Sequence, residues 1–231
     1  MCGRYASSRR PDDLVSYFEV EDPPEELLEP SWNVAPTDPV FVVGVSQGRR
    51  RLRVARWGLV PSWAADAKVG ARFINARAET LADKPAFRAA YARRRCLVPA
   101  DGYYEWQRDG VVKQPWFLSD RGGDPLAMAG LYERWRAPDG AWLLSCTIVT
   151  TSAPDELGRI HDRTPLLVPR GAWPLWLDPT VADPGDLLVP GVSGVLDAWP
   201  VDRAVGNVRN DGPTLVLPVG SRPAGTGWPA G

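Results

Sequence analysis

The residues with the clearest chemical potential stand at the start of the chain, where Cys2 follows the initiator Met1. Cys2 is small enough for a methionine aminopeptidase to remove Met1, which would leave an α-amine and a thiol on one residue. Such a 1,2-aminothiol condenses with an aldehyde: the amine forms an imine, and the thiol closes on the imine carbon to give a thiazolidine ring. Both groups have ordinary pKa values only about one to two units above neutrality, so each has a reactive form in the cell.

Three other side chains could assist this chemistry. His161, the only histidine, ends a segment expected to be helical, where the helix dipole favours imidazolium and suits an acid or base. Glu105 lies between aromatic residues on an expected strand, where it is either paired with an arginine or desolvated with a raised pKa. Asn75 lies among apolar residues, and a buried amide must find hydrogen-bond partners there.

Each of these residues also has a structural interpretation when it is taken singly. A cysteine near a terminus can be incidental, and a lone histidine is usually a structural or surface residue. Glu105 can be one half of an ion pair, and Asn75 can simply form a turn. Only their combination indicates a reactive site.

Composition limits the kinds of protein that this chain can be. Its 231 residues, 44% hydrophobic and 24% charged, suit one domain around one core. With a net charge of -1, nucleic-acid binding would depend on a local basic patch. The cysteines, Cys2, Cys96 and Cys146, form no CxxC pair, so we expect neither a disulfide framework nor a metal site. The lack of a signal peptide and of a long apolar run predicts a cytoplasmic protein that does not bind membranes.

Strands dominate the expected secondary structure. Alternating and β-branched runs around turn residues predict hairpins and single strands at 40–45, 52–57, 96–99, 103–107, 116–118, 126–134, 142–150 and 164–168. Short helices are expected near Pro11 and over 84–95, 152–161 and 171–177. This pattern predicts an α+β fold with a mainly antiparallel or mixed β-sheet in a single domain, residues 2–218. Residues 219–231, rich in Pro and Gly, are expected to be a disordered tail.

Short motifs recur along this domain in a recognisable order. They are Cys2-Gly3-Arg4-Tyr5, Asn33-Val34-Ala35-Pro36, Trp57-Gly58-Leu59, Asn75-Ala76-Arg77-Ala78-Glu79-Thr80, Gly102-Tyr103-Tyr104-Glu105-Trp106, His161-Asp162-Arg163 and Asn207-Val208-Arg209-Asn210. In order and spacing the chain resembles the SRAP family, the SOS-response-associated peptidases, now understood as abasic-site processing proteins. The resemblance implies the SRAP fold, a sheet curled toward a barrel with short peripheral helices.

The resemblance also implies a function in the DNA damage response. Members of this family bind single-stranded DNA at replication forks and trap the ring-opened aldehyde of an abasic site as a thiazolidine on the N-terminal cysteine. The catalytic residues would then be Cys2, Asn75, Glu105 and His161. The implied DNA contacts are Arg4, Asn33, Pro36, Trp63, Arg77, Trp106, Thr150 and Arg163. We expect no cofactor, no metal and a monomer that associates with the nucleoid when bound to DNA. Thr164 departs from the Met or Arg that is usual at its position in the family.

Two other functions stay open at this point. Cys2, His161 and Asn75 are also the residue types of a thiol hydrolase, so the protein could be an N-terminal-cysteine peptidase or amidohydrolase that removes Met1 or cleaves amides. Turnover of small amide substrates would reveal that activity. A non-catalytic strand-binding module would form only complexes that dissociate in denaturant. A lyase activity on the abasic strand is also compatible with an imine intermediate.

Overall fold

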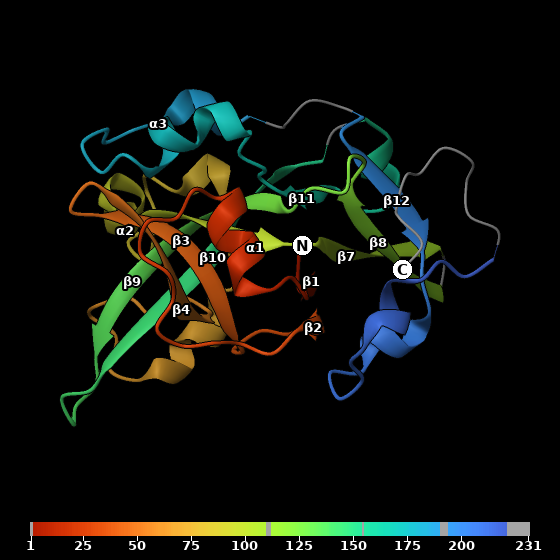
Figure 1. The fold of residues 1–231 in the computed structure, drawn as a ribbon, viewed down its shortest axis with the longest axis horizontal. Helices are drawn as coiled ribbons and strands as arrows, with labels where there is room; N and C mark the ends of the chain where they lie inside the picture. Colours follow the sequence, from red (N-terminus) through yellow and green to blue (C-terminus); the bar gives the residue numbers. More distant parts are fainter. Residues whose placement is uncertain (1, 110–111, 154, 190–193, 221–231) are drawn as a thin grey trace.

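The computed structural model describes residues 2–109, 112–153, 155–189 and 194–220, and its strands form two sheets (Figure 1). The smaller sheet has five antiparallel strands in the order β12-β8-β7-β1-β2. Their bounds are β1 Tyr5–Ser7, β2 Ser31–Val34, β7 Gly102–Asp109, β8 Val112–Asp120 and β12 Leu196–Pro200. The short first strand is therefore an inner strand of this sheet, between β7 and the edge strand β2.

The larger sheet closes into a five-stranded barrel. Its strands follow the order β10-β4-β3-β6-β9, and a further pairing of β9 with β10 completes the ring. All neighbours are antiparallel except β4 and β10. The bounds are β3 Pro39–Ser46, β4 Arg49–Trp57, β6 Arg95–Ala100, β9 Leu126–Arg136 and β10 Trp142–Ser152. This arrangement confirms the expected α+β fold with a mixed sheet curled into a barrel.

Two short strands extend the barrel beyond its ring. The strand β5, Asn75–Arg77, runs parallel to β10, and β11, Arg163–Pro165, runs antiparallel to it. Both attach near the carboxyl end of β10, where Thr150 pairs with Arg77 on one side and Pro165 on the other. Segments that are distant in the sequence and carry predicted site residues therefore meet at one end of β10.

The helices are short and peripheral (Figure 1). The α-helices are α1 Pro11–Tyr17, α2 Arg88–Arg93 and α3 Trp173–Leu177. The described 3-10 helices are Ala67–Arg72, Ala78–Thr80, Asp155–Arg159, Arg170–Ala172, Gly185–Leu187, Arg203–Gly206 and Pro213–Val216. Buried side chains of all three α-helices join one hydrophobic cluster with strands of the barrel. Among the described residues, no helix is long and apolar enough to cross a membrane.

Several expected boundaries differ from those of the structure. The helix expected over 84–95 is α-helical only from Arg88 to Arg93, because Arg95 already belongs to β6 and its buried guanidinium donates to Tyr91, Trp176 and Asp178 carbonyls. The segment expected as a helix over 152–161 forms only a 3-10 helix within that range. Val219 still donates a backbone hydrogen bond to Pro200. Residues 221–231 lie outside the described residues, so the disordered tail stays a prediction.

A second hydrophobic cluster joins the two sheets around Cys2. It contains Tyr5 and Tyr103 from the five-stranded sheet, and Trp57 and Ile148 from the barrel. Side chains alternate across a strand, so Tyr103 and Glu105 share one face of β7 and Tyr104 and Trp106 share the other. The third cluster, which includes Tyr104, Phe117 and Trp199, covers that other face.

Close packing inside the barrel predicts the effect of one added methyl group. A Cβ at Gly130 would lie 2.9 Å from both Cys96 Sγ and Val98 Cγ2, whereas one at Gly44 would meet only Tyr132, at 3.7 Å. We expect Gly130→Ala to lower the free energy of unfolding by about 1–3 kcal/mol through overpacking. Gly44→Ala, the matched control, should be neutral or slightly stabilising, because it reduces the entropy of the unfolded chain. Denaturant titration measures both, and equal stabilities of the two variants would contradict this account.

Candidate active site

The structure holds Cys2 inside the protein rather than at a frayed end. Its side chain is fully buried, and the strand that follows pairs through Tyr5 with Tyr103 on one side and Val34 on the other. The thiol lies 3.8 Å from the carbonyl oxygen of Arg4. Burial, with a contribution from the negative charge of Glu105, raises the pKa of the Cys2 thiol well above its ordinary value. The thiol is therefore protonated in this environment.

Asn75 contacts the backbone of the same residue. Its side-chain Nδ2 donates to the carbonyl oxygen of Cys2 at 2.7 Å. The position of Asn75 is set by β5, which pairs Asn75 with Ile148 of the barrel. The other side-chain atom, Oδ1, is buried and accepts no hydrogen bond from any described residue. A buried carbonyl oxygen without a donor is costly, so this atom is suited to accept a hydrogen bond from a ligand or from a new donor on Cys2.

Glu105 lies on the face of β7 that contacts the segment 159–164. On one side of it, the hydroxyl groups of Tyr103 and Thr164 lie 2.8 Å apart, and on the other, Gln107 Nε2 donates to the Arg159 carbonyl. Glu105 is only 3% exposed. Burial raises its pKa to about 7, and the nearby charge of Asp162 acts in the same direction. Protonated and ionised forms of this carboxyl group can therefore both be present near neutral pH.

His161 follows the 3-10 helix Asp155–Arg159, and the packing of Leu157 and Ile160 against the cluster around Cys2 fixes its position. Its Nδ1 lies 2.9 Å from both the amide nitrogen of Arg163 and a carboxylate oxygen of Asp162. These two contacts need opposite protonation states of Nδ1, since an amide only donates and a carboxylate only accepts. The backbone amide is fixed, whereas Asp162 is 87% exposed, so we assign Nδ1 as the acceptor and the proton of neutral His161 to Nε2.

The structure thus gathers the four predicted catalytic residues from four separate segments. Cys2 contacts Asn75 directly and lies within electrostatic range of Glu105. Glu105 in turn faces the segment that carries His161. Sequence reasoning did not identify Tyr103, whose hydroxyl ties β7 to β11 through Thr164. The alternation along the motif Gly102–Trp106 was the available signal, because it places Tyr103 on the same face as Glu105.

Arg4 is the predicted DNA contact nearest to Cys2 in the sequence. Its Nη1 donates to Asn33 Oδ1 and to the Val205 carbonyl, both at 3.1 Å. None of the described residues accepts a hydrogen bond from Nε or Nη2, so one edge of the guanidinium can still bind an anion. Partial burial lowers the pKa of Arg4, and the charge of Asp38 opposes that effect.

Asn33, also expected to contact DNA, is instead buried, with 4% of its surface exposed. Its Nδ2 lies within hydrogen-bonding distance of the Val205, Asn207 and Asn210 carbonyls, at 3.3, 3.1 and 2.8 Å. Its Oδ1 accepts from Arg4. With both ends of the amide occupied inside the protein, the geometry favours a role in positioning Arg4 over a direct contact with DNA.

Arg77, Thr150 and Arg163 lie together at the end of β10. Arg163 forms a bidentate ion pair with Glu79, at 2.6 and 3.0 Å, and donates to the Thr150 carbonyl. Thr150 of β10 is fully buried, whereas its neighbour Arg77 on β5 is exposed. Arg77 can therefore reach a phosphate without rearrangement, while Arg163 would have to share its guanidinium with Glu79.

The predicted stacking residues lie on different parts of the surface. Trp63 is 65% exposed in a loop, and Pro36 is half-buried directly before Thr37, whose φ of 80° is unusual for a β-branched residue. Trp106 is partly buried against the third cluster. It is adjacent to Glu105 in sequence but lies on the opposite face of β7, so the two side chains do not share one pocket.

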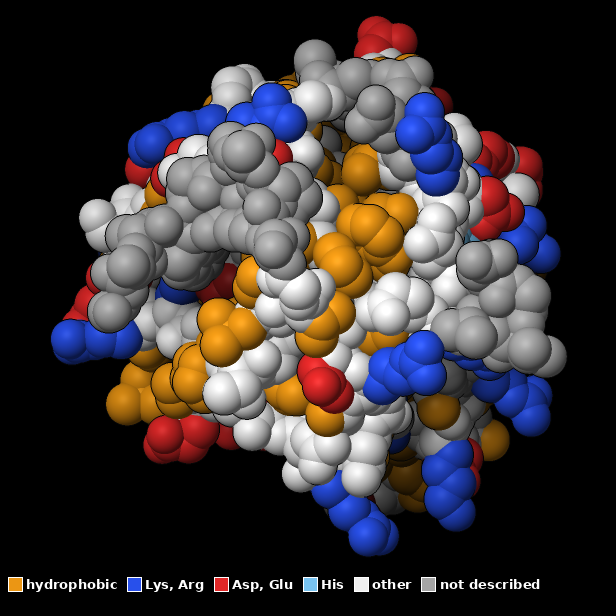
Figure 2. Space-filling model, turned by 90° about the vertical axis from the view of Figure 1, so that its right-hand side faces the viewer, with side chains coloured by type: hydrophobic (Ala, Val, Ile, Leu, Met, Phe, Trp, Pro, Cys, Tyr) orange, Lys and Arg blue, Asp and Glu red, His pale blue; other side chains and the backbone are white. Residues whose placement is uncertain are grey.

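On the face shown in Figure 2, the positive charges are spread out rather than gathered in one patch. In the face shown in Figure 2, hydrophobic side chains gather in the middle, and Lys and Arg side chains lie mostly around the edge. The arginine-rich tip of the β3–β4 hairpin is neutralised by carboxylates, since Arg49 and Arg51 pair with Asp22, and Arg50 pairs with Glu19. Binding to a nucleic acid would therefore depend on individual arginines such as Arg4 and Arg77.

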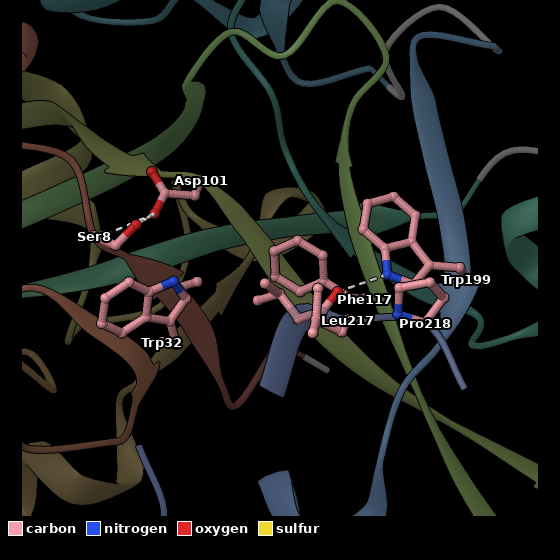
Figure 3. A pocket seen from close by; sticks show the side chains of 9 residues that line it. Ser8, Trp32, Asp101, Phe117, Trp199, Leu217 and Pro218 are labelled. Atoms are coloured by element: carbon pink, nitrogen blue, oxygen red, sulfur yellow. Dashed lines mark hydrogen bonds between the residues drawn. The ribbon is translucent and has the colours of Figure 1, made fainter. Parts of the chain in front are cut away.

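A small cavity lies on the Trp106 face of the five-stranded sheet (Figure 3). Its walls are mostly apolar, and the Ser8–Asp101 hydrogen bond of 2.7 Å closes one end. The cavity volume is about 80 Å³. An engineered cavity of roughly 150 Å³ holds benzene, so this one is too small for a nucleobase. Among the described residues no group of His, Cys, Asp and Glu side chains could hold a metal ion.

The fold and site define a protein in which Cys2 is buried between two sheets, just before an inner strand and near a carboxyl group of raised pKa. A family model described as "SOS response associated peptidase (SRAP)" matches residues 1–208, and the chain belongs to this family. This result confirms the family predicted from the motifs.

Three similar proteins align with nearly the whole chain. Abasic site processing protein YoqW of Bacillus subtilis is 38% identical over 94% of this chain and 99% of its own length. Abasic site processing protein YedK of Escherichia coli is 32% identical over 95% and 100%. Abasic site processing protein HMCES of Xenopus tropicalis is 31% identical over 95% of this chain and 78% of its own length.

Solved structures share the fold. A crystal structure of a Bacteroides thetaiotaomicron protein has a TM-score of 0.85 at 23% identity, covering 94% of this chain and all of its own. One of a Bordetella bronchiseptica protein has a TM-score of 0.75 at 28% identity, covering 87% of this chain and all of its own.

The raised pKa of Glu105 predicts how stability depends on pH. Between its ordinary pKa of 4.5 and about 7, the folded protein binds more protons at Glu105 than the unfolded chain does. Stability from this group is therefore fully present below pH 4.5 and is lost as the pH rises through 7. Since one pKa unit corresponds to about 1.4 kcal/mol, wild type should lose about 3 kcal/mol relative to Glu105→Gln between pH 4 and pH 8.

Urea titrations across this pH range measure the effect. The control is Glu26→Gln, which alters an exposed glutamate in the loop before β2 and should leave the pH profile as in wild type. Parallel profiles for wild type and Glu105→Gln would show that Glu105 titrates in the folded protein as it does in the unfolded chain.

Proposed function

We propose that this protein senses and shields abasic sites, by binding single-stranded DNA and forming a covalent thiazolidine between mature Cys2 and the ring-opened aldehyde. The names of the relatives support abasic-site processing in DNA damage as the general activity. One observation carries the finer proposal: Asn75 donates a hydrogen bond to the backbone carbonyl of Cys2, while the Cys2 thiol lies near Glu105. We expect the protein to act as a monomer, at replication forks.

Glu105 starts the reaction as a general acid. An abasic sugar is mostly a closed hemiacetal, which does not react with amines. The protonated carboxyl group of Glu105 gives its proton to the ring oxygen as the bond from that oxygen to C1 breaks, and the hydroxyl on C1 loses a proton to become the aldehyde. A pKa of about 7 suits this step, because proton donors work best when their pKa lies near the working pH.

The α-amine of mature Cys2 then attacks the aldehyde carbon. Asn75 Oδ1, which has no donor among the described residues, is suited to accept a hydrogen bond from this amine and to orient its lone pair. The addition product loses water to give the imine, and a proton donor is needed for the departing hydroxyl. His161 can supply and take back such protons, since its segment lies against the face of β7 that carries Glu105.

The thiol closes the ring last. Because burial keeps Cys2 protonated, the amine reacts before the sulfur does. Ring closure forms the bond between sulfur and the imine carbon, and the thiol proton moves to the nitrogen. In the product, the nitrogen and the sulfur of Cys2 are both bonded to the former aldehyde carbon of the sugar. No free aldehyde therefore remains to react elsewhere.

The arginines hold the strand while this happens. Arg4 has an unused guanidinium edge two residues from Cys2, and Arg77 is exposed at the end of β5. Such contacts with phosphates give salt-dependent affinity without sequence preference. Trp63, 65% exposed, can stack on a base, as strand-binding proteins do.

A thiol hydrolase is the less favoured function. Cysteine nucleophiles of hydrolases are activated by a lowered pKa, usually beside a cation or a helix N-terminus. Burial and the charge of Glu105 shift the pKa of Cys2 in the opposite direction. A thiol in this environment suits closure onto a preformed imine better than attack on an amide.

Substitution of Cys2 tests the proposal. Mature protein with Cys2→Ala should give no heat-stable adduct with an abasic single strand, because ring closure needs the thiol. Cys2→Ala can still form an imine, so borohydride should trap it. Denaturing gels and intact mass measure both products, with loss of one water expected in the wild-type adduct. A heat-stable adduct of Cys2→Ala without reductant would refute the thiazolidine.

The role of Glu105 as acid has a kinetic test. Glu105→Gln keeps the size of the side chain but cannot donate a proton of comparable acidity, so adduct formation should slow by ~100- to 10,000-fold. Affinity for an intact strand should not change. Since the same group must assist the reverse reaction, exchange of a preformed adduct with excess abasic strand should slow as well. Wild-type rates in both directions would assign the acid to another residue.

A further inference from the structure

The motif Asn207-Val208-Arg209-Asn210 has no role in the chemistry above, yet its loop is firmly held. Asn33 Nδ2 lies within hydrogen-bonding distance of the Val205, Asn207 and Asn210 carbonyls. Asn210 Nδ2 in turn donates to the Ala204 carbonyl at 2.8 Å. The amide of Arg209 donates to Asn207 Oδ1 at 3.1 Å. The next residue, Asp211, accepts from the amide of Trp32 at 2.7 Å. These bonds fix the conformation of residues 206–210, which we call the C-terminal loop.

The same bonds connect the C-terminal loop to Arg4. The Val205 carbonyl, directly before the loop, accepts from Arg4 Nη1, and Asn33 Oδ1 accepts from the same nitrogen. Arg4, Asn33 and the loop therefore form one hydrogen-bonded unit beside the strand that begins after Cys2. A ligand held by the unused edge of Arg4 would pass close to this loop.

The tip of the C-terminal loop presents an apolar and a cationic side chain to solvent. Val208 is 56% exposed, and Arg209 next to it is exposed as well. No carboxylate among the described residues lies within ion-pair distance of Arg209. A single exposed valine is ordinary. Here, however, a buried amide holds that valine and an unneutralised arginine on a fixed loop beside Arg4, and ordering such a loop is costly in entropy.

We propose that the C-terminal loop is part of the DNA-binding surface, with Arg209 contacting a backbone phosphate and Val208 packing against a sugar or base next to the abasic site. This inference rests on the proposed function and extends it to a second binding element. The occupant must be anionic and partly apolar, which describes an unstacked single strand. Asn33 is then a positioning residue, because it holds both Arg4 and the loop in place.

The test compares binding of an intact single-stranded oligonucleotide by mature variants over a range of salt concentrations. Arg209→Ala should weaken binding roughly tenfold, the size of one lost charged hydrogen bond. It should also reduce the slope of log affinity against log salt by about 0.7, the value for one phosphate of a single strand. Arg209→Lys should restore the slope. Val208→Ser should weaken binding by about threefold without a change in slope, since it removes an apolar contact.

Arg203→Ala is the matched control, because it removes one exposed charge from the preceding 3-10 helix without altering the loop tip. It should bind as wild type does. Equal binding by Arg209→Ala, Val208→Ser and Arg203→Ala would overturn this inference and leave the proposed function intact. Failure of wild type to form any adduct with an abasic strand would instead overturn the proposed function.

Discussion

The structure depends on one constraint: the segment just after Cys2 forms an inner strand of a sheet, β1, Tyr5–Ser7. β1 has β7 on one side and β2 on the other, and Cys2, three residues before Tyr5, is fully buried between the two sheets. A terminus is normally the most mobile part of a domain. Here backbone pairing on both sides and the bond from Asn75 fix it, so a reactive amine and thiol on Cys2 would be held in one orientation before any ligand arrives. Such preorganisation lowers the entropic part of a reaction barrier.

Burial of this site changes the acid–base properties of two groups in ways that complement each other. Desolvation makes both the Cys2 thiol and the Glu105 carboxyl group weaker acids, and the negative charge of Glu105 adds to the effect on the thiol. A carboxyl group with a pKa of about 7 can give and take protons, whereas the thiol stays protonated and unreactive toward most electrophiles. The same low-polarity environment therefore makes an acid available and protects the cysteine from side reactions until an imine forms.

The sequence predicted the local structure better than the long-range pairing. Hairpins such as 126–134 with 142–150 were predictable because alternation and an Asp-Gly turn lie within one short stretch. Closure of the barrel was expected only from the family resemblance. The parallel pair of β4 with β10 joins segments that are distant in the sequence, and no local pattern in either segment indicates that they pair. The candidate site was predictable in its chemical groups but not in all their roles. Asn33 shows this difference: its contact with DNA stays a prediction, whereas its buried position between Arg4 and the C-terminal loop was not predictable from its motif.

Strand β7 divides the site into two surfaces through its alternation. Tyr103, Glu105 and Gln107 face the segment that carries His161, whereas Tyr104 and Trp106 face the third cluster. A shift of one residue in the pairing of β7 would exchange the two sets, and it would put Trp106 where an acid is needed. The register is fixed where β7 meets β8, since a Cβ on Gly102 would lie 2.4 Å from the ring of Phe117 and only glycine fits. The close approach of β8 to Gly102 thus helps to decide which side chain of the motif reaches Cys2.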